Sequence, residues 1–419
     1  MTSQSIQWPK VRLGDLFRIK HGFAFKGEGF SDEPGAIVLT PGNFHPSGGI
    51  KLRPEKDRSY TGTYPPEFIL RPGELLVVMT DLTQEAAILG APAFVPSDPV
   101  CLHNQRLGKV IDLDENRLDQ RFLFYLFNGS DYRAEIKATA TGSTVRHTSP
   151  SRIYDCRVAL PPLDTQRRIA GILGAYDDLI EVNRRRVAVL EAMARSCVAE
   201  FAAKPAGGLT PAGNRRAASE IVGGWFARDL GDLAEIVMGQ SPPGEDLNQE
   251  GLGIAFHQGV TEFGALFPSR RVSCAKPHPK KVAEPGDLLF SVRAPVGRIN
   301  IAAERTALGR GVAAIKPPDY GRHFFTAQLR AIFHTTDLIG NGSIYKAVNR
   351  QDIEKVQIVW AEQATIERIE RYLRPIYDEL FVLHQSNLKL AAARDLLLPR
   401  LISGQIDVGT AERQLETAA

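Results

Sequence analysis

Two stretches of the chain carry the same short motifs in the same order, and this internal repeat limits the possible folds more than any other feature. The matches pair Trp8 with Trp225, Leu13-Gly14-Asp15-Leu16 with Leu230-Gly231-Asp232-Leu233, Pro72-Gly73 with Pro285-Gly286, and Ile153 with Ile353. The offset between matched residues falls from 217 to 200, so the second copy is 17 residues shorter. Because 419 residues exceed what one hydrophobic core usually organises, the repeat predicts two globular domains of one kind.

Each copy ends in a long segment with the residue spacing of a coiled coil. Apolar residues recur at intervals that alternate between four and three residues, which is a heptad pattern. The first pattern comprises Ile169, Leu173, Tyr176, Ile180, Asn183, Val187, Leu190, Ala194, Cys197 and Phe201, and the second comprises Ile369, Leu373, Ile376, Leu380, Leu383, Asn387, Leu390, Arg394, Leu397 and Leu401. A helix over the first pattern would be about 48 Å long.

Asn183 and Asn387 interrupt the two patterns at positions that would meet if the helices ran in opposite directions. A buried amide is unfavourable unless it is hydrogen-bonded, and two asparagines can satisfy each other while fixing the register. We therefore expect an antiparallel coiled coil with Asn183 against Asn387. Two independent amphipathic helices are the alternative.

Two prolines fall within the second heptad segment. Pro375 and Pro399 stand where the first copy has Ala175 and Ala199. Because an interior proline removes a backbone hydrogen bond, we expect a kink or a restart of the helix at each. Pro375 could also lie in the first turn of a new helix.

The segments before the helices are rich in glycine and proline and contain short β-like runs bounded by turns. The sequence thus predicts an α+β (mixed) fold, in which two globular α/β domains are separated by two long helices packed as an antiparallel coiled coil, with a pseudo-twofold internal repeat. The predicted order is an N-terminal domain over residues 1–160, a long helix over 161–204, a linker over 205–224, a C-terminal domain over 225–360, a second long helix over 361–404 and a tail over 405–419.

Composition narrows the class of protein only in part. The 51 Lys and Arg residues against 48 Asp and Glu give a net charge of +3, which neither requires nor excludes a polyanionic partner. Four cysteines without C-x-x-C spacing indicate free thiols in a reducing compartment. Since the chain also has no signal-peptide pattern and no apolar run near ~18 residues, we expect a cytoplasmic protein without a membrane partner.

The sequence contains none of the common catalytic signatures. It has no G-x-x-x-x-G-K-[ST], H-E-x-x-H or G-x-S-x-G motif, and no Asn/Asp-Pro-Pro-Tyr/Phe motif of adenine methyltransferases. The nine histidines are scattered without metal-ligand spacing. We therefore expect no bound cofactor or metal, and a chain that is not an enzyme by itself.

Basic, amide and hydroxyl side chains in predicted loops are the remaining indication of function. Arginine suits guanine edges, asparagine and glutamine suit adenine, and hydroxyls suit phosphates or bases. For any single residue the alternative is a solvated or ion-paired surface side chain. The candidate DNA contacts are Lys20, Lys26, Arg106, Ser143, Thr144, Arg146, His147 and Arg152 in the first domain, and Gln258, Arg270, Arg271, Arg293, Arg310, Tyr345, Lys346, Asn349 and Arg350 in the second.

From Trp8 to Val408 the chain resembles the specificity (S) subunits of type I restriction-modification enzymes. The order of several motifs, found twice, carries this resemblance. They are the opening W-x-x-x-x-L-G-D-L, the Pro-Gly-Glu/Asp-Leu-Leu strand, Ser291-Val292-Arg293-Ala294-Pro295-Val296-Gly297 followed by Gly309-Arg310-Gly311, Leu160-Pro161-Pro162-Leu163 up to Gln166, and Leu397-Leu398-Pro399-Arg400-Leu401-Ile402-Ser403-Gly404. The start of the second helix, Trp360-Ala361-Glu362-Gln363, departs from the pattern because it lacks the two prolines.

The resemblance implies two target-recognition domains, each reading one half of an asymmetric, bipartite site in double-stranded DNA. It implies helices that set the spacer and dock two methyltransferase (M) subunits, and restriction (R) subunits that complete the enzyme. S-adenosylmethionine, ATP and Mg are then expected on the partner subunits. The alternatives are the specificity subunit of a related system with fused methylation and cleavage partners, a non-catalytic coiled-coil adaptor, and an enzyme with an unrecognised site.

Overall fold

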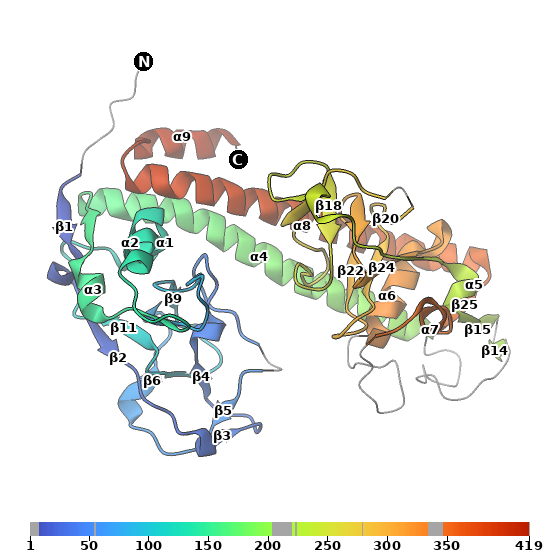
Figure 1. Cartoon of the computed structure of the whole chain (residues 1–419), viewed down its shortest axis with the longest axis horizontal. Coiled ribbons are helices and arrows are strands. Elements are labelled where there is room, and N and C mark those ends of the chain that lie inside the picture. Colours follow the sequence, from blue (N-terminus) through green and yellow to red (C-terminus); the bar gives the residue numbers. More distant parts are fainter. Residues whose placement is uncertain are drawn as a thin grey trace. The chain divides into compact units, whose positions relative to one another are not determined.

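In the computed structural model the chain forms two compact units, each with its own core (Figure 1). Unit 1 comprises Met1–Ile180 and Lys389–Ala419, and unit 2 comprises Glu181–Leu388. Two helices of 40 residues, α4 (Leu163–Ala202) and α8 (Gln363–Ile402), contribute to both units. The structure describes residues 8–53, 56–202, 220–222, 224–278, 280–333 and 347–418.

Unit 1 contains two small sheets and two shorter strand pairs. The four-stranded sheet has the order β2 (Arg18–His21), β11 (Leu107–Ile111), β7 (Leu75–Val78), β9 (Pro92–Phe94). The five-stranded sheet has the order β3 (Phe30–Ser31), β5 (Ser59–Tyr60), β4 (Ile37–Leu39), β10 (Cys101–His103), β6 (Ile69–Leu70). The pairs are β1 (Lys10–Arg12) with β13 (Arg157–Ala159), and β8 (Thr80–Asp81) with β12 (Arg146–His147).

Strand β7 is buried on both faces, which explains its continuous apolar run. Successive side chains of a strand point to opposite faces of the sheet. Leu75 and Val77 therefore enter one core with α1 (Gln120–Asn128), whereas Leu76 and Val78 enter a second core below the five-stranded sheet. The turn before the strand places Gly73 at a φ of +82°, a conformation that favours glycine and accounts for the Pro-Gly motif.

The helices of unit 1 include α1, α2 (Ser130–Ala138), α3 (Pro150–Asp155) and the first part of α4. Gln166 of α4 is completely buried and joins this helix to the start of α1. Its Oε1 accepts from the backbone N–H of Asp119 at 2.9 Å, and its Nε2 donates to the carbonyl oxygens of Arg117 and Pro161 at 2.8 Å. All of this amide's polar atoms are thereby satisfied inside the protein.

Most of the predicted tail forms a helix, α9 (Val408–Ala418). Val408 and Ala411 are buried in the core of unit 1 together with Leu398 and Leu401 of α8. Arg168 of α4 donates to Glu412 at 2.5 Å, and this hydrogen bond lowers the pKa of the Glu412 carboxyl. The segment is therefore a packed element of the fold.

Unit 2 has sheets of the same strand order as unit 1. The four-stranded sheet runs β16 (Glu235–Met238), β24 (Val312–Lys316), β21 (Leu288–Ser291), β22 (Ile299–Ile301), and the five-stranded sheet runs β17 (Leu247–Asn248), β19 (Val272–Cys274), β18 (Ile254–His257), β23 (Thr306–Leu308), β20 (Val282–Ala283). A third sheet has the order β14 (Glu220–Val222), β15 (Trp225–Asp229), β25 (Gln357–Ala361). Strand β14 lies in the predicted 205–224 linker, most of which falls outside the described residues.

The helices of unit 2 cover its sheets and attach to α8. They are α5 (Leu230–Leu233), α6 (Arg322–Phe333), α7 (Arg350–Glu354) and the parts of α4 and α8 that belong to this unit. Glu370 of α8 is 3% exposed and binds the start of α6. Its Oε1 accepts from the backbone N–H groups of His323 and Phe324 at 2.8 Å, where the positive end of the helix dipole favours a carboxylate.

Helix α8 continues through both prolines, so of the predicted kink or restart at each proline the restart is wrong. Next to Pro375, Leu373 and Tyr377 are buried in the core of unit 2. Next to Pro399, Leu398 and Leu401 are buried in the core of unit 1. This burial on both sides of each proline offsets the lost backbone hydrogen bond.

Polar side chains pair the two long helices within each unit. In unit 2, Asn183 is 3% exposed and its Nδ2 donates to Oδ1 of Asn387 at 2.9 Å, and Arg186 pairs with Glu379. In unit 1, Arg394 donates to Asp177 at 2.5 Å. Arg394, which breaks the apolar heptad pattern, thus finds a carboxylate on the opposite helix.

Among the described residues, no helix is long and apolar enough to cross a membrane.

The asparagine pair gives a first prediction. Asn183→Ala should lower the free energy of unfolding of unit 2 by about 1–2 kcal/mol, because it leaves the Asn387 amide without its partner. Replacing both asparagines by leucine should restore most of this loss, since no polar group then stays buried unpaired. Urea unfolding followed by the fluorescence of Trp225 and Trp360 measures both effects. A neutral single variant would contradict the role of the pair.

A second prediction concerns His103 of β10 and His257 of β18. Burial lowers the pKa of each imidazole to about 4 from 6.5, so the unfolded chain binds protons at a higher pH than the folded chain does. Stability should therefore fall as the pH decreases from about 6.5 towards about 4, by up to ~1.4 kcal/mol per pH unit for each histidine.

Urea titrations at several pH values test this dependence. His257→Gln should make the slope of stability against pH shallower, whereas His278→Gln, at an exposed position, should leave it unchanged. Equal slopes in wild type and His257→Gln would show that this histidine does not set the pH dependence.

Candidate nucleic-acid interface

In unit 1, backbone hydrogen bonds bring three candidate segments together at the ends of strands. The N–H of Phe23 donates to His103 O at 2.8 Å, and the N–H of Gln105 donates to Phe23 O at 2.9 Å. Next to them, the N–H of Met79 donates to Arg106 O, and the N–H of Thr148 donates to Met79 O, each at 3.0 Å. The turn that carries Arg106 therefore lies beside the β8–β12 pair.

Unit 2 holds corresponding segments in the same way. The N–H of Val292 donates to Gly311 O, and the N–H of Val348 donates to Val292 O, each at 3.0 Å. A bridge also pairs Arg293 with Ala347, just as Thr80 pairs with His147 in unit 1. The loops that hold Arg293, Arg310 and Asn349 thus meet in one region of unit 2.

Several candidates in unit 1 are held by hydrogen bonds within the protein. The guanidinium of Arg146 donates to Gly142 O at 3.3 Å and Lys137 O at 3.2 Å, and that of Arg152 donates to Thr141 Oγ1 at 3.1 Å. The His147 ring bonds the Thr80 hydroxyl at 3.1 Å. Lys20 pairs with Glu67 at 3.1 Å. These contacts within the protein hold the 137–152 segment and the edge of β2 in place.

Arg270 is the most strongly held candidate in unit 2. Its guanidinium donates to Ser273 Oγ, to the carbonyl oxygens of Gly251 and Gly253, and to Glu304, at distances of 2.8 to 3.1 Å. With these acceptors around it, Arg270 ties the 251–253 turn to β19. The residue therefore stabilises unit 2 itself.

Two further candidates in unit 2 stabilise helix α7. The Asn349 side chain caps the helix by accepting from the N–H of Asp352 at 3.1 Å. Arg350 pairs with Glu354 at 2.7 Å, one turn further along the same helix. Both side chains are exposed, but their polar groups are engaged locally.

The remaining described candidates direct their side chains to solvent or share a hydrogen-bond partner. Gln258 and Arg310 share a bond partner in Ser241, which sequence reasoning missed although it lies two residues after the repeated Gly239. Tyr345 and Lys346 lie outside the described residues. The candidates that are solvent-exposed and have no side-chain partner in the described part of the chain are Lys26, Arg106, Ser143, Thr144, Arg271 and Arg293.

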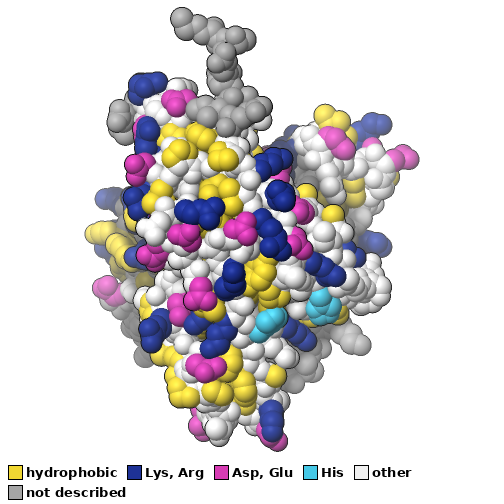
Figure 2. Space-filling model, turned by 90° about the vertical axis from the view of Figure 1, so that its left-hand side faces the viewer, with side chains coloured by type: hydrophobic (Ala, Val, Ile, Leu, Met, Phe, Trp, Pro, Cys, Tyr) yellow, Lys and Arg dark blue, Asp and Glu magenta, His cyan; other side chains and the backbone are white. Residues whose placement is uncertain are grey.

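Charge on the surface is mixed and does not form a single basic patch on the face that Figure 2 shows. On this face Lys and Arg side chains are interspersed with Asp and Glu. This distribution agrees with the net charge of +3. On this face, exposed donors in particular loops are therefore stronger candidates for binding a polyanion than the overall surface charge is.

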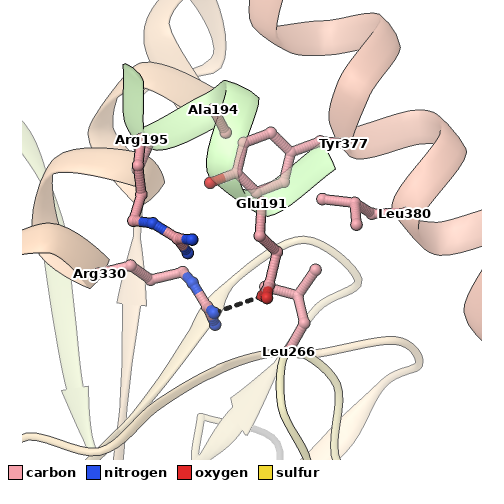
Figure 3. A pocket seen from close by; sticks show the side chains of 8 residues that line it. Glu191, Ala194, Arg195, Leu266, Arg330, Tyr377 and Leu380 are labelled. Carbon is pink, nitrogen blue, oxygen red and sulfur yellow. Dashed lines mark hydrogen bonds and ion pairs between the residues drawn. The ribbon is translucent and has the colours of Figure 1, made fainter. Parts of the chain in front are cut away.

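Unit 2 contains a small pocket between α4, α6 and α8 (Figure 3). Arg330 of α6 donates to Glu191 of α4 at 2.7 Å, and Arg195 and Tyr377 also line the pocket. Its volume of about 20 Å³ is far below the ~300–1,000 Å³ of typical small-molecule sites. Burial raises the pKa of Tyr377 far above its ordinary value. The residues that line this pocket attach α6 to the long helices, and the pocket is too small to hold a nucleotide.

Within the described ranges, no group of three or more His, Cys, Asp or Glu residues could hold a metal ion. The chemistry that the loops do offer is hydrogen-bond donation from guanidinium, ammonium, amide and hydroxyl groups. Donors of this kind bind phosphate oxygens and the acceptor atoms of base edges. Two units with like sheets and donor-bearing loops are an arrangement suited to nucleic-acid recognition.

Comparison with known proteins agrees with this class. Residues 5–192 match the family described as type I restriction modification DNA specificity domain. A Methanocaldococcus jannaschii protein, named for the specificity subunit of the type I restriction enzyme MjaX, is 28% identical over 327 residues, which are 77% of this chain and 74% of that protein. The EcoBI specificity subunit of Escherichia coli is 23% identical over 334 residues, or 74% of this chain and 66% of the other.

A solved structure shows the same fold. The crystal structure of a type I restriction-modification system S subunit from M. genitalium aligns with 95% of this chain and 96% of its own, at a TM-score of 0.57 and 14% identity. The family match over residues 5–192 and these relatives show that the chain is similar to the specificity subunits of type I restriction-modification systems. The resemblance and the mixed α+β class predicted from the sequence are thereby confirmed.

The contrast between two neighbouring arginines gives a prediction. Arg270→Ala should lower the free energy of unfolding of unit 2 by about 1–2 kcal/mol, because four acceptor groups lose their donor. The matched control is Arg271→Ala, an exposed neighbour that should change stability by less than ~0.5 kcal/mol. Urea unfolding monitored by tryptophan fluorescence distinguishes the two, and equal losses would contradict the structural role of Arg270.

Proposed function

We propose that each globular part of the chain reads one half of an asymmetric, bipartite site in double-stranded DNA. The observation that carries this proposal is the combination of like sheets with unlike loops. The two units share their strand orders, yet they carry different side chains at corresponding loop positions, such as Thr80 and Arg293. Similar sheets whose loops carry different donors should recognise different bases.

We also propose which residue ranges form the recognition domains and which form the connecting helices. Residues 1–160 and 225–360 would be the target-recognition domains, joined by the long helices over 161–204 and 361–404. The strand pair β1–β13, which closes unit 1 just before α4, supports the first boundary. The β15–β25 pair plays the same part before α8 in unit 2 and supports the second.

We further propose that α4 and α8 form an antiparallel coiled coil related to the internal repeat by a pseudo-twofold axis. Three polar pairs support this arrangement: Asp177 with Arg394 in unit 1, and Asn183 with Asn387 and Arg186 with Glu379 in unit 2. In unit 2 the later residue of α4, Arg186, pairs with the earlier residue of α8, Glu379, as an antiparallel arrangement requires. The length of such a coiled coil would set the number of unread base pairs between the half-sites.

Catalysis would be supplied by partner subunits. The proposed assembly contains two methyltransferase (M) subunits docked on the helices, and restriction (R) subunits. S-adenosylmethionine, ATP and Mg would be bound by those partners, and this chain would be non-catalytic. Because the assembly acts on DNA, we place it in the cytoplasm. The similarity of the chain to type I specificity subunits supports this composition.

Mapping of methylated adenines tests the proposal. The full chain is co-expressed with its methyltransferase subunit, and the methylated motif is read by genome-wide sequencing. We expect two defined half-sites of different sequence separated by an unread spacer. A methylated motif that is symmetric or has no spacer would contradict the bipartite reading.

The same assay tests the helices as a spacer. Inserting seven residues near residue 185 of α4 and seven near residue 385 of α8 preserves the heptad register and lengthens each helix by about 10 Å. The unread spacer should grow by about three base pairs, with both half-sites unchanged. Seven residues inserted instead within 205–219 should not alter the motif. An unchanged spacer in the lengthened protein would show that the helices do not set it.

A further inference from the structure

Three segments of unit 2 are fixed against one another by backbone hydrogen bonds. The N–H of Gly239 donates to Val312 O at 3.0 Å and that of Gln240 to Leu308 O at 2.9 Å. The N–H of Gly309 donates to His257 O at 2.9 Å, and that of Gly311 to Gln258 O at 3.0 Å. The side chains that follow these strands are therefore held on a rigid frame.

The turn Gly309-Arg310-Gly311 packs directly on Gln258 and leaves room for one side chain. A Cβ atom on Gly309 would lie 2.5 Å from Oε1 of Gln258, and one on Gly311 would lie 2.3 Å from the Gln258 carbonyl oxygen. Both distances are shorter than any real contact, so these positions require glycine. Arg310 is the only side chain that the turn presents, and both Gln258 and Arg310 are exposed.

Ser241 links these two side chains through an ordered set of donors and acceptors. Arg310 donates to Ser241 Oγ from its Nε at 3.3 Å and from its backbone nitrogen at 3.4 Å. Since arginine can only donate, the serine oxygen accepts both bonds. The serine hydroxyl then donates to Oε1 of Gln258 at 2.8 Å. This bond turns the amide oxygen of Gln258 towards Ser241 and its NH₂ group away.

We propose that Ser241 is a positioning residue that makes Gln258 and Arg310 a donor-only edge, and that this edge reads a guanine in the half-site of unit 2. The inference rests on the proposed function and deepens it. The Nη groups of Arg310 and the amide NH₂ of Gln258 present only donors. In the major groove guanine offers two acceptors, N7 and O6, whereas cytosine offers a donor.

Unit 1 lacks this arrangement, so its half-site should not respond to the same change. The strand pair β10–β4 of unit 1 corresponds to the pair β23–β18 of unit 2. His103 lies opposite Leu39 in the first pair, and Leu308 lies opposite His257 in the second. Thr40, which follows Leu39, therefore corresponds to Gln258, which follows His257. The Thr40 hydroxyl bonds Oδ1 of Asn43 at 2.9 Å inside a local cap. No donor pair equivalent to Gln258 and Arg310 is formed there among the described residues.

Selection of sequences from a randomised duplex library by the full-length chain tests the inference. Wild type should enrich a bipartite motif with a guanine in one half, favoured about tenfold or more over other bases. Ser241→Ala should reduce this preference at that position, in the same half that Arg310→Ala affects, and leave the other half intact. Ser241→Thr keeps the hydroxyl and should retain the preference. Ser269→Ala, at an exposed serine elsewhere in unit 2, is the control.

An amide-to-acid change sharpens the test. Gln258→Glu keeps the side-chain shape but replaces the NH₂ donor by an acceptor, so the preference should move from guanine towards cytosine.

The possible results distinguish a failure of the proposed function from a failure of the role of Ser241. Absence of any enriched motif with wild type would contradict the proposed function and the inference together. A normal motif that Ser241→Ala leaves unchanged, or that loses both halves, would contradict the role of Ser241 alone. A motif in which the altered position is not guanine would overturn the donor-only edge.

Discussion

The candidate loops of each unit depend on one strand that is buried on both faces. In β7 and β21 alternate side chains enter two different cores, as Leu75 and Leu76 do in unit 1 and Leu288 and Leu289 do in unit 2. A shift of one residue would exchange every side chain between the cores, so the register is strongly fixed. The residues directly after these strands begin the candidate loops. Their positions are therefore set by the apolar interior, independently of any bound DNA.

Buried polar side chains fix how each recognition part is attached to the long helices. Gln166 satisfies the backbone at the start of α1, and Glu370 does the same at the start of α6. Neither side chain could stay buried without these bonds, because an unsatisfied amide or carboxylate in the interior is strongly unfavourable. The bonds thus specify one orientation of α1 or α6 against its long helix, which apolar packing alone would specify less sharply.

Sequence patterns predicted the repeated elements well, because those elements depend on local periodicity. The heptads gave the long helices, and Pro72-Gly73 gave the turn before β7, whose glycine has a positive φ. The patterns did not predict that α8 continues past Pro375. The helix continues because tertiary burial of the neighbouring apolar residues outweighs the lost backbone hydrogen bond. They also missed that residues 408–418 form a helix packed into the core of unit 1.

By itself, the sequence determined the order of the elements, the two like units and the resemblance to type I specificity subunits, all of which follow from motifs read along the chain. Only the tertiary structure decided which donors are free to contact another molecule. Arg270 and Arg271 are adjacent and chemically identical, yet only Arg270 finds Gly251, Gly253 and Glu304 around it. Likewise, Ser241 meets Gln258 and Arg310 because three strands bring distant residues within hydrogen-bonding distance. Such partners are selected by separation in space, which residue spacing does not encode.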